Sequence, residues 1–214
     1  MSEEIFERVP IPKAKRIFDI IMVFTLVVIL SPLIFLIILW IFVEQIIIPA
    51  SRGSIFYCET RISAARLFKF YKFRIFKQKI VDRERKKHSC IHTKPLEGNI
   101  KNLTYYGRFL KQIYMDELPQ LINVIRGDMT LVGPRPTNVE VSDQIKKLGD
   151  YTKEKMVCGI TGSFQAQKGG RGNQRKLDED YINYVASNPG WKVVIKDLKI
   201  IFKTIQTIFK AEGI

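Results

Sequence analysis

A long uncharged stretch runs from Ile20 to Val43, and aliphatic and aromatic residues dominate it. About 20 apolar residues are enough to cross a bilayer as a helix, so the pattern predicts a membrane helix. Ser31 and Pro32 lie near its middle. Proline removes a backbone hydrogen bond and kinks a helix, and a neighbouring serine can satisfy the freed group. Each half is then about 17 Å long, close to one leaflet of a hydrocarbon core about 30 Å thick.

The charges on both sides of this stretch indicate how it enters the membrane. Lys13, Lys15 and Arg16 precede it, and the chain that follows it is strongly basic. Positive flanks favour the cytoplasmic side, and a single spanning helix would place one of them outside. A re-entrant helix–break–helix keeps both flanks inside. We therefore predict a re-entrant membrane helix over residues 15–48, with one spanning helix as the alternative.

The remaining pattern predicts a mixed α/β fold that is mainly helical. Residues 55–77 are rich in β-forming residues and predict two short strands. The charged residues 78–102 predict the start of a helix and then a loop. Apolar spacing predicts several further short elements, namely helices over residues 105–114, 118–125 and 139–149, a strand over residues 130–132 and a turn over residues 159–162.

The C-terminal segment predicts an amphipathic helix, with an apolar pattern formed by Val194, Leu198, Ile201, Ile205 and Ile208. Such a helix either packs on the core or lies on anionic lipid. The basic and aromatic residues of the predicted strands are compatible with base stacking, a membrane interface or an ordinary half-buried strand.

Composition narrows the function classes. The net charge is +14, and all of the excess lies after the apolar stretch. Such a body favours nucleic acid, an anionic membrane surface or phosphorylated substrates. The three cysteines are an odd number without a Cys-x-x-Cys motif, which argues against a disulfide framework or a structural zinc site. His88, Cys90 and His92 lack zinc spacing, and the glycine-rich loop of residues 168–173 lacks the framing of a P-loop.

An adjacent acid pair, Asp116 and Glu117, precedes one of the predicted helices. Acids at a helix start are commonly capping features, but Arg108 and Lys111 lie just before this pair. Aspartate can attack phosphorus as a nucleophile, and its neighbour can hold Mg²⁺. Arg135, between two prolines, can clamp phosphate oxygens. The set is suited to phosphoryl transfer, which depends on positioning and charge neutralisation.

The chain resembles the bacterial sugar transferases, specifically the small monotopic polyprenyl-phosphate phosphoglycosyl transferases, from about Lys13 to Phe209. The motifs that carry the resemblance lie along the whole chain: Lys15-Arg16-Ile17-Phe18-Asp19, Ser31-Pro32, Lys72-Phe73-Arg74, Asp116-Glu117-Leu118-Pro119-Gln120, Gly127 to Pro136, Gly159-Ile160-Thr161-Gly162 with Gln165, Asp197-Leu198-Lys199-Ile200, and Lys203-Thr204.

This resemblance implies transfer of a sugar 1-phosphate from a UDP-sugar to undecaprenyl phosphate, with release of UMP, as the first membrane step of surface glycan synthesis. Asp116 would carry a phosphosugar intermediate in a ping-pong cycle, and Glu117 would bind Mg²⁺. Substrate phosphates would be bound by a basic and polar set: Arg135, Lys111, Arg108, Lys72, Arg74 and Gln165. Nucleic acid is not an expected partner, and the oligomeric state stays open, a dimer included.

The resemblance also implies an arrangement in the membrane. Ser31 and Pro32 would break the helix so that the protein enters only the cytoplasmic leaflet of the bacterial inner membrane. We expect a tail over residues 1–14, the re-entrant helix, and a small globular catalytic domain with interfacial amphipathic helices over residues 49–214.

Several positions depart from the family pattern. They are Ser63 and Ala65 in place of glycines, Ile75-Phe76 in place of Thr-Met, Lys111 in place of Arg, Tyr114 in place of Ser, Cys158 in place of Pro, and Tyr181 in place of an acidic residue. All lie outside the acid pair and the Pro-Arg-Pro turn, so they bear on the substrate pocket more than on the reaction. The competing function is a membrane-tethered basic protein that binds nucleic acid or lipid without chemistry, which leaves the acid pair unexplained.

The re-entrant arrangement predicts the location of the N-terminus. A cysteine introduced at Ser2, in a variant without the native cysteines, should not react with a membrane-impermeant thiol reagent added to intact cells. The same site should react after the cells are permeabilised. Labelling from outside would instead support one spanning helix.

Overall fold

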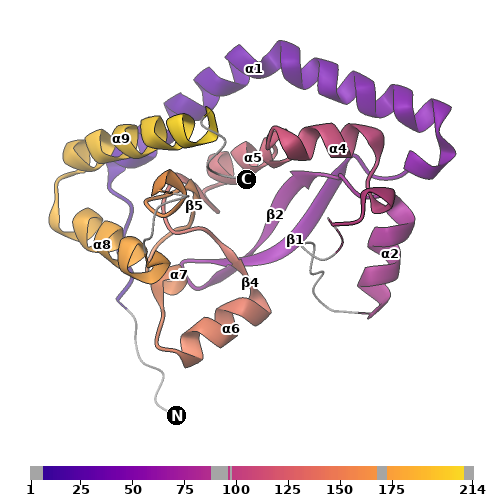
Figure 1. Cartoon of the computed structure of the whole chain (residues 1–214). Helices are drawn as coiled ribbons and strands as arrows, with labels where there is room; N and C mark the ends of the chain where they lie inside the picture. The colour runs from indigo at the N-terminus through magenta and orange to yellow at the C-terminus, as the bar shows by residue number, and fades with distance from the viewer. Residues whose placement is uncertain (1–6, 88–95, 97, 168–172, 210–214) are drawn as a thin grey trace. The chain divides into compact units, whose positions relative to one another are not determined.

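The computed structural model describes residues 7–87, 96, 98–167 and 173–209 (Figure 1). The chain forms two compact units that interleave along the sequence. The first unit comprises Met1–Val23, Arg61–Phe68 and Asn123–Ile214, and the second comprises Phe24–Thr60 and Lys69–Ile122. The sequence predicted a different division, into a tail, a membrane segment and a catalytic domain that follow one another along the chain. That division stays a prediction.

The apolar stretch forms α1, Lys13–Ile47, one unbroken helix of 35 residues that Figure 1 draws as a continuous ribbon. Among the described residues it is the one helix long and apolar enough to cross a membrane, with a mean hydropathy of 3.1 over its apolar window. Pro32 lies inside the helix and does not end it. The prediction that Ser31 and Pro32 end one helix and begin another is therefore wrong, whereas the re-entrant path of α1 through the membrane stays a prediction.

Ser31 explains how the helix continues through the proline. Pro32 has no N–H to donate to the carbonyl of Val28, four residues before it. The Ser31 hydroxyl donates to that carbonyl oxygen instead, at 2.8 Å. A side-chain hydrogen bond thus replaces the missing backbone bond, as the sequence predicted for the serine.

Two strands follow α1, as predicted. β1, Phe56–Ser63, lies next to β2, Arg66–Phe73, and β4, Thr137–Asn138, pairs antiparallel with the other edge of β1. The turn between β1 and β2 has positive φ at Ala64 (48°) and Ala65 (55°). Two positive φ values define a type I′ turn, which favours Gly or Asn. Alanine in this conformation costs about 1 kcal/mol, so the family's glycine would fit position 65 better.

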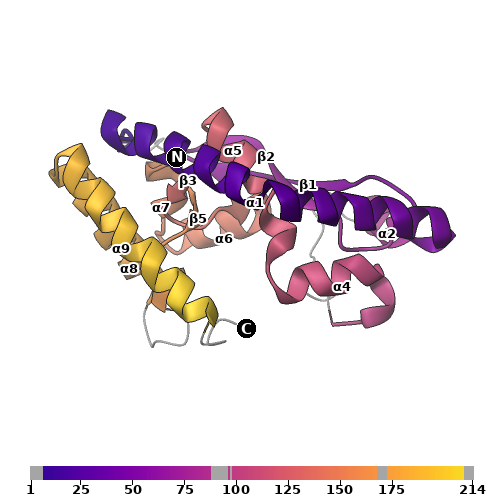
Figure 2. The same ribbon diagram turned by 90° about the horizontal axis from the view of Figure 1, so that it is seen from above.

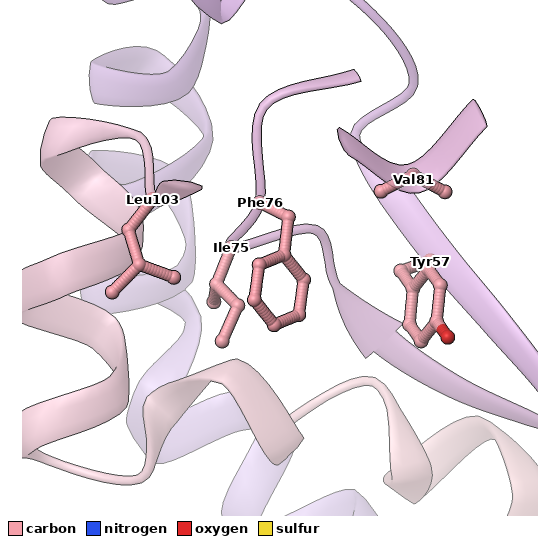
Figure 3. Close-up of a cluster of buried hydrophobic side chains, with 5 residues drawn as sticks. All are labelled: Tyr57, Ile75, Phe76, Val81 and Leu103. Atoms are coloured by element: carbon pink, nitrogen blue, oxygen red, sulfur yellow. The ribbon is translucent and has the colours of Figure 1, made fainter. Parts of the chain in front are cut away.

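The second unit contains two clusters of buried apolar side chains. Figure 3 shows the first, which joins β1, the segment after β2, helix α2 (Gln78–Lys87) and the segment after the 3-10 turn η2 (Ile100–Asn102). Its members are Tyr57, Ile75, Phe76, Val81 and Leu103. Backbone bonds reinforce it, because the N–H of Thr104 donates to the Ile75 oxygen at 2.9 Å.

The second cluster, which we call the α1 cluster, joins α1, β2 and helix α4 (Tyr105–Gln112). Its buried members are Ile37, Ile41, Phe73, Tyr106 and Leu110, and the partly buried Leu33, Ile38, Ile55, Met115 and Leu118 pack against it. Met115 begins the 3-10 turn η3, Met115–Glu117. The second half of α1 is therefore packed on the same core as the turn that carries the acid pair.

Glu44, near the end of α1, fixes the start of α4. Its carboxylate accepts the backbone N–H groups of Tyr105 at 3.0 Å and Tyr106 at 2.8 Å, and it accepts the Ser51 hydroxyl at 2.6 Å. Ser51 belongs to the short 3-10 turn η1, Pro49–Ser51. The Thr104 hydroxyl accepts the next N–H, from Gly107, at 3.0 Å. A buried anion at a helix N-terminus satisfies orphan donors and is stabilised by the helix dipole.

The first unit contains a two-stranded parallel sheet. β3, Thr130–Val132, pairs with β5, Gly159–Thr161, with Thr130 opposite Gly159. The β3 strand was predicted, whereas the predicted turn over residues 159–162 is wrong because Gly159–Thr161 pairs with β3. The other elements of this unit are α6 (Val139–Lys147), α7 (Thr152–Lys155), η4 (Gln165–Gln167), α8 (Gln174–Ser187) and α9 (Gly190–Phe209). Helices α8 and α9 lie side by side (Figure 2).

Helix α9 was predicted correctly, and the structure shows which of its faces is buried, a point that the sequence left open. Val193, Asp197, Ile200 and Thr207 are buried, whereas Leu198 is 47% exposed. A second apolar face is exposed and consists of Trp191, Ile195, Leu198, Phe202, Ile205 and Ile208. The expected stripe thus falls largely on the exposed face. The buried face includes a charged residue, which apolar spacing does not predict.

Replacing Glu44 by alanine should lower the free energy of unfolding by about 3 kcal/mol, because buried N–H and O–H donors lose a charged acceptor. Thermal unfolding in detergent would measure the loss. Glu179→Ala is the matched control, since its ion pair with Arg175 is exposed at the surface and should contribute at most about 1 kcal/mol. Equal unfolding temperatures for the two variants would contradict the proposed role of Glu44.

Candidate active site

The acid pair lies in η3, directly before helix α5, Gln120–Arg126, as the sequence predicted. Asp116 is buried, with 6% of its surface exposed, and Glu117 is half-buried. Tyr114, just before this turn, has a φ of 56°. Such a value is uncommon for a residue other than glycine and persists where surrounding packing enforces it. The packing of Met115 and Leu118 on the α1 cluster supplies that constraint.

Lys72 is a cation that the structure places beside the acid pair. Its Nζ donates to Glu117 Oε1 at 3.0 Å and lies 3.9 Å from Asp116 Oδ2. The three side chains are mostly shielded from solvent. The exposed fraction of the side chain alone is 18% for Lys72, 18% for Glu117 and 9% for Asp116. The positive charge of Lys72 therefore offsets the repulsion between two neighbouring carboxylates in a partly desolvated place.

The position of Lys72 follows from its neighbours in β2. Phe73 is buried in the α1 cluster, and Arg74 is buried as well. The Lys72 ammonium also lies 5.6 Å from the centre of the Phe70 ring, two residues before it on the same strand face. A buried strand end on one side and a packed 3-10 turn on the other thus hold the ammonium against the carboxylates.

Arg74 and Arg108, two other predicted cations of the second unit, have different environments. The guanidinium of Arg74 donates to three backbone oxygens, those of Ser51, Ser54 and Phe76, and burial lowers its pKa. We therefore leave Arg74 out of the proposed substrate site, because its donors hold the chain's own backbone. Arg108 is half-buried on α4, where it donates to the Ile100 oxygen at 3.2 Å and covers the Tyr105 ring. Lys111 is half-buried in the last turn of α4.

Arg135 belongs to the first unit, where its backbone is held on both sides. The Pro134 oxygen accepts the N–H of Gly159 at 2.8 Å, and the Pro136 oxygen accepts Arg61 Nη1 at 2.8 Å. Two prolines and two hydrogen-bonded carbonyls fix the backbone at Arg135, and with it the direction in which the half-buried side chain projects. The sequence prediction of a stiff turn is supported by this geometry.

Glycine is required where this turn passes β5, both at the first residue of the strand and just after its last residue. A Cβ on Gly159 would lie 2.1 Å from the backbone nitrogen of Gly133, and a Cβ on Gly162 would lie 2.3 Å from the Gly133 oxygen. Both distances are far below van der Waals contact. The two glycines after Cys158 are thus needed to bring the chain close to the Pro-Arg-Pro turn.

The strand before Arg135 is anchored in a buried polar network. The Val132 oxygen accepts Lys15 Nζ at 3.0 Å, and the Tyr181 hydroxyl oxygen lies 3.1 Å from it. Lys15 also pairs with Asp197 at 2.6 Å, and Tyr181 donates to the other oxygen of that carboxylate at 2.6 Å. Burial raises the pKa of Tyr181 well above its usual value, and the neighbouring Asp197 carboxylate adds to this shift. Burial also raises the pKa of Asp197, although Lys15 opposes that change.

This network joins residues from three separate helices to the strand before Arg135. Lys15 comes from the start of α1, Asp197 from α9, and Tyr181 from α8. Asp19, one turn after Lys15, bonds the hydroxyl of Thr130 on β3. The departure at position 181 therefore supplies a neutral donor to Asp197 where the family has an acid.

Two other departures from the family pattern compensate each other. The Cys158 N–H donates to the Ser63 hydroxyl oxygen at 2.9 Å, and that hydroxyl donates to the Asp128 oxygen at 2.8 Å. A proline at position 158 has no N–H, and a glycine at position 63 has no hydroxyl. The family's residues would therefore lack both the donor and the acceptor of this bond, and neither group would be left buried without a partner. Burial raises the pKa of the Cys158 thiol to about 12, so it is protonated at neutral pH.

Gln165 lies in η4 of the first unit, and its buried Oε1 finds no hydrogen-bond partner among the described residues. Nor do those residues contain a group of three or more His, Cys, Asp or Glu side chains that could hold a metal. The adjacent carboxylates of Asp116 and Glu117 still fit Mg²⁺, which takes one or two carboxylates and otherwise water and substrate phosphates. His88, Cys90 and His92 lie outside the described residues, as do residues 168–172 of the basic loop.

Sequence reasoning missed the structural role of Glu44. The available signal was a lone acid at the end of an apolar helix, which needs a partner if it is buried. It also missed the link between Lys15 and Asp197. These residues are separated by 182 positions, and no local pattern pairs them.

Comparisons with known proteins give a consistent result. Residues 11–211 match the model of a family described as bacterial sugar transferase. The chain is 33% identical over 213 residues to the undecaprenyl-phosphate galactose phosphotransferase of Salmonella typhimurium, a match that covers 93% of this chain and 41% of that protein. It is 32% identical to the exopolysaccharide production protein ExoY of Sinorhizobium fredii, over 94% of this chain and 87% of that one. A UDP-glucose:undecaprenyl-phosphate glucose-1-phosphate transferase of Klebsiella pneumoniae is also 32% identical, over 89% of this chain and 39% of its own. The chain thus spans about two fifths of the Salmonella and Klebsiella proteins and most of ExoY.

The network around Asp197 predicts a distinct pH dependence. Tyr181→Phe should lower the free energy of unfolding by about 1–2 kcal/mol at neutral pH, because it removes the buried hydrogen bond to the Asp197 carboxylate. The folded wild type keeps the Tyr181 proton above pH 10, where the unfolded chain releases it, so this residue's contribution to stability is lost as pH rises.

The stability gap between wild type and Tyr181→Phe should therefore narrow above about pH 10. Guanidinium unfolding in detergent micelles at a series of pH values would measure the gap. Tyr184→Phe is the control, since the hydroxyl of Tyr184 makes only an exposed 3.5 Å bond. A gap that stays constant with pH would contradict this assignment.

Proposed function

Because the chain belongs to the bacterial sugar transferase family, we propose that it transfers a sugar 1-phosphate from a UDP-sugar to a polyprenyl phosphate and releases UMP. The relatives from Salmonella and Klebsiella are named for transfer to undecaprenyl phosphate. The observation that carries the proposal is the acid pair with its lysine: Asp116 buried, Glu117 beside it, and Lys72 against both.

Asp116 is the nucleophile in this proposal. Its carboxylate oxygen attacks the phosphorus that bears the sugar, and the bond from that phosphorus to the UMP oxygen breaks. UMP leaves, and the sugar phosphate stays on Asp116 as an acyl-phosphate. In the second half of the cycle an oxygen of the polyprenyl phosphate attacks the same phosphorus and releases the Asp116 carboxylate. The result is a polyprenyl diphosphate sugar and a regenerated enzyme.

Charge neutralisation is the task of the surrounding residues. Arg135 binds phosphate oxygens through its guanidinium, and Lys72, Lys111 and Arg108 supply further positive charge. Glu117 would hold Mg²⁺, which when bound offsets the negative charge of the donor diphosphate. The proximity of Glu117 to Asp116 in one packed turn supports this assignment.

The membrane supplies the acceptor. Only 11% of the apolar window of α1 is buried, so lipid is the natural cover for its side chains. The exposed apolar face of α9, flanked by lysines, supports an interfacial position for that helix. We propose that the protein is monotopic on the cytoplasmic face of the inner membrane, with both flanks of α1 inside. The α1 cluster then holds the acid pair over the leaflet that contains the acceptor phosphate.

A labelling experiment tests the reaction. Wild type incubated with a radiolabelled UDP-sugar should form a covalent phosphosugar adduct that survives denaturation. Asp116→Asn should form none and should lower UMP release by about a thousandfold or more. Asp143→Asn is the matched control, because that carboxylate lies on α6 and is 60% exposed. It should label like wild type.

The donor sugar would be found by assaying a panel of UDP-sugars for UMP release. A wild-type protein that forms no adduct with any of them would count against the proposed reaction. An adduct that persists in Asp116→Asn would count against the assigned nucleophile.

A further inference from the structure

The Lys72 ammonium forms an ion pair with the Glu117 carboxylate, which would bind the proposed metal. Its ammonium donates to Glu117 Oε1 at 3.0 Å, the contact of a direct ion pair. It lies 3.9 Å from Asp116 Oδ2, so both acids face the same charge. A divalent ion that binds a Glu117 oxygen at about 2.0–2.1 Å would lie next to this ammonium, and the two positive charges would repel each other.

The backbone of Lys72 cannot relieve this conflict. The next residue, Phe73, is buried in the α1 cluster with Ile37 and Ile41, and the guanidinium of Arg74 is held by three carbonyls. The carboxylates are equally constrained, because Met115 and Leu118 flank them in the same cluster. The backbones of both segments are thus fixed, and the side chains of Lys72 and Glu117 can move only by rotation about their own bonds. Metal binding at Glu117 therefore requires the ammonium to leave that oxygen.

We propose that Lys72 is an exchangeable counter-ion, an inference that rests on the proposed function. In the substrate-free protein its ammonium pairs with Glu117. When a nucleoside diphosphate sugar arrives with its divalent cation, the ammonium moves from Glu117 to the donor's phosphate oxygens, and Glu117 turns to the metal. Each cation then faces an anion, and no buried charge is left without a partner.

This exchange has a consequence for the order of binding. Without the donor, a divalent cation must displace the Lys72 ammonium from Glu117 although no phosphate is present to accept that ammonium. The cation alone therefore binds weakly. The metal and the diphosphate together provide that partner, so they bind as a unit. Lys72 is in this sense a positioning residue that couples metal binding to donor binding. It also keeps a cation beside the Asp116 nucleophile in the absence of donor.

Mn²⁺ binding without any nucleotide tests the exchange. The free Mn²⁺ signal in electron paramagnetic resonance measures the affinity of the detergent-purified, full-length protein for the metal alone. Lys72→Met should bind Mn²⁺ at least about tenfold more tightly than wild type, because the competing charge is gone. Lys72→Arg, which keeps a cation, should bind as weakly as wild type. Lys79→Met, which removes an exposed charge on α2 of the same unit, should also match wild type.

A double variant locates the metal. Adding Glu117→Gln to Lys72→Met should abolish the gained affinity. Thermal unfolding shows whether each variant is folded, and Lys72→Gln provides the same comparison if Lys72→Met does not fold. Equal Mn²⁺ affinities for wild type and the uncharged variants would overturn the counter-ion role, and so would a gain that survives Glu117→Gln. Since no sugar nucleotide or turnover is involved, either result would leave the proposed reaction standing, whereas an absent phosphosugar adduct would overturn the reaction alone.

Discussion

The packing of the second half of α1 against β2 and α4 is the contact on which the acid pair depends. Ile37 and Ile41 meet Phe73, Tyr106 and Leu110 in one buried cluster. The same cluster receives Met115 and Leu118, the residues on either side of Asp116 and Glu117. An element suited to a membrane is thus part of the core that fixes the turn of the acid pair. Loss of that packing would disturb Lys72 and both acids together, since all three are carried by segments that end in the cluster.

Charged side chains fix the two ends of α1, where Lys15 and Glu44 are buried. At its start Lys15 pairs with Asp197, and Arg16 donates to the Val124 and Ile125 oxygens at the end of α5. At its other end Glu44 accepts the first N–H groups of α4. A buried charge is costly without a partner, so each of these contacts specifies one arrangement within its own unit. Apolar surface alone, which is plentiful on α1, would not select one.

Local patterns in the sequence predicted much of this fold. The strands β1, β2 and β3 and the helices α4, α6 and α9 follow from apolar periodicity and from turn residues such as Gly127. The acid pair was expected at a helix start, and η3 places it there. These features are predictable because the residues that determine them are neighbours in the chain.

Most features that the sequence did not predict depend on contacts between distant segments, whereas the continuity of α1 at Pro32 depends on a local hydrogen bond. The break at Pro32 was predicted from backbone chemistry, but the Ser31 hydroxyl bonds the Val28 carbonyl and the helix continues. The sequence left the buried face of α9 open, because Asp197 is buried there only with the help of Lys15 and Tyr181. Arg74 resembles a phosphate ligand in sequence, yet its donors bond carbonyls that only the folded chain brings near.

The central claim is that one oxygen of Asp116 forms a bond to phosphorus. The most direct measurement is mass spectrometry of peptides from wild-type protein quenched soon after addition of an accepted UDP-sugar and no acceptor. The account predicts a phosphosugar on the peptide that contains residues 115–118, with fragmentation that places it on Asp116, and loss of the adduct when polyprenyl phosphate is added. A phosphosugar on any other residue, or UMP release that requires acceptor and never yields an adduct, would contradict it.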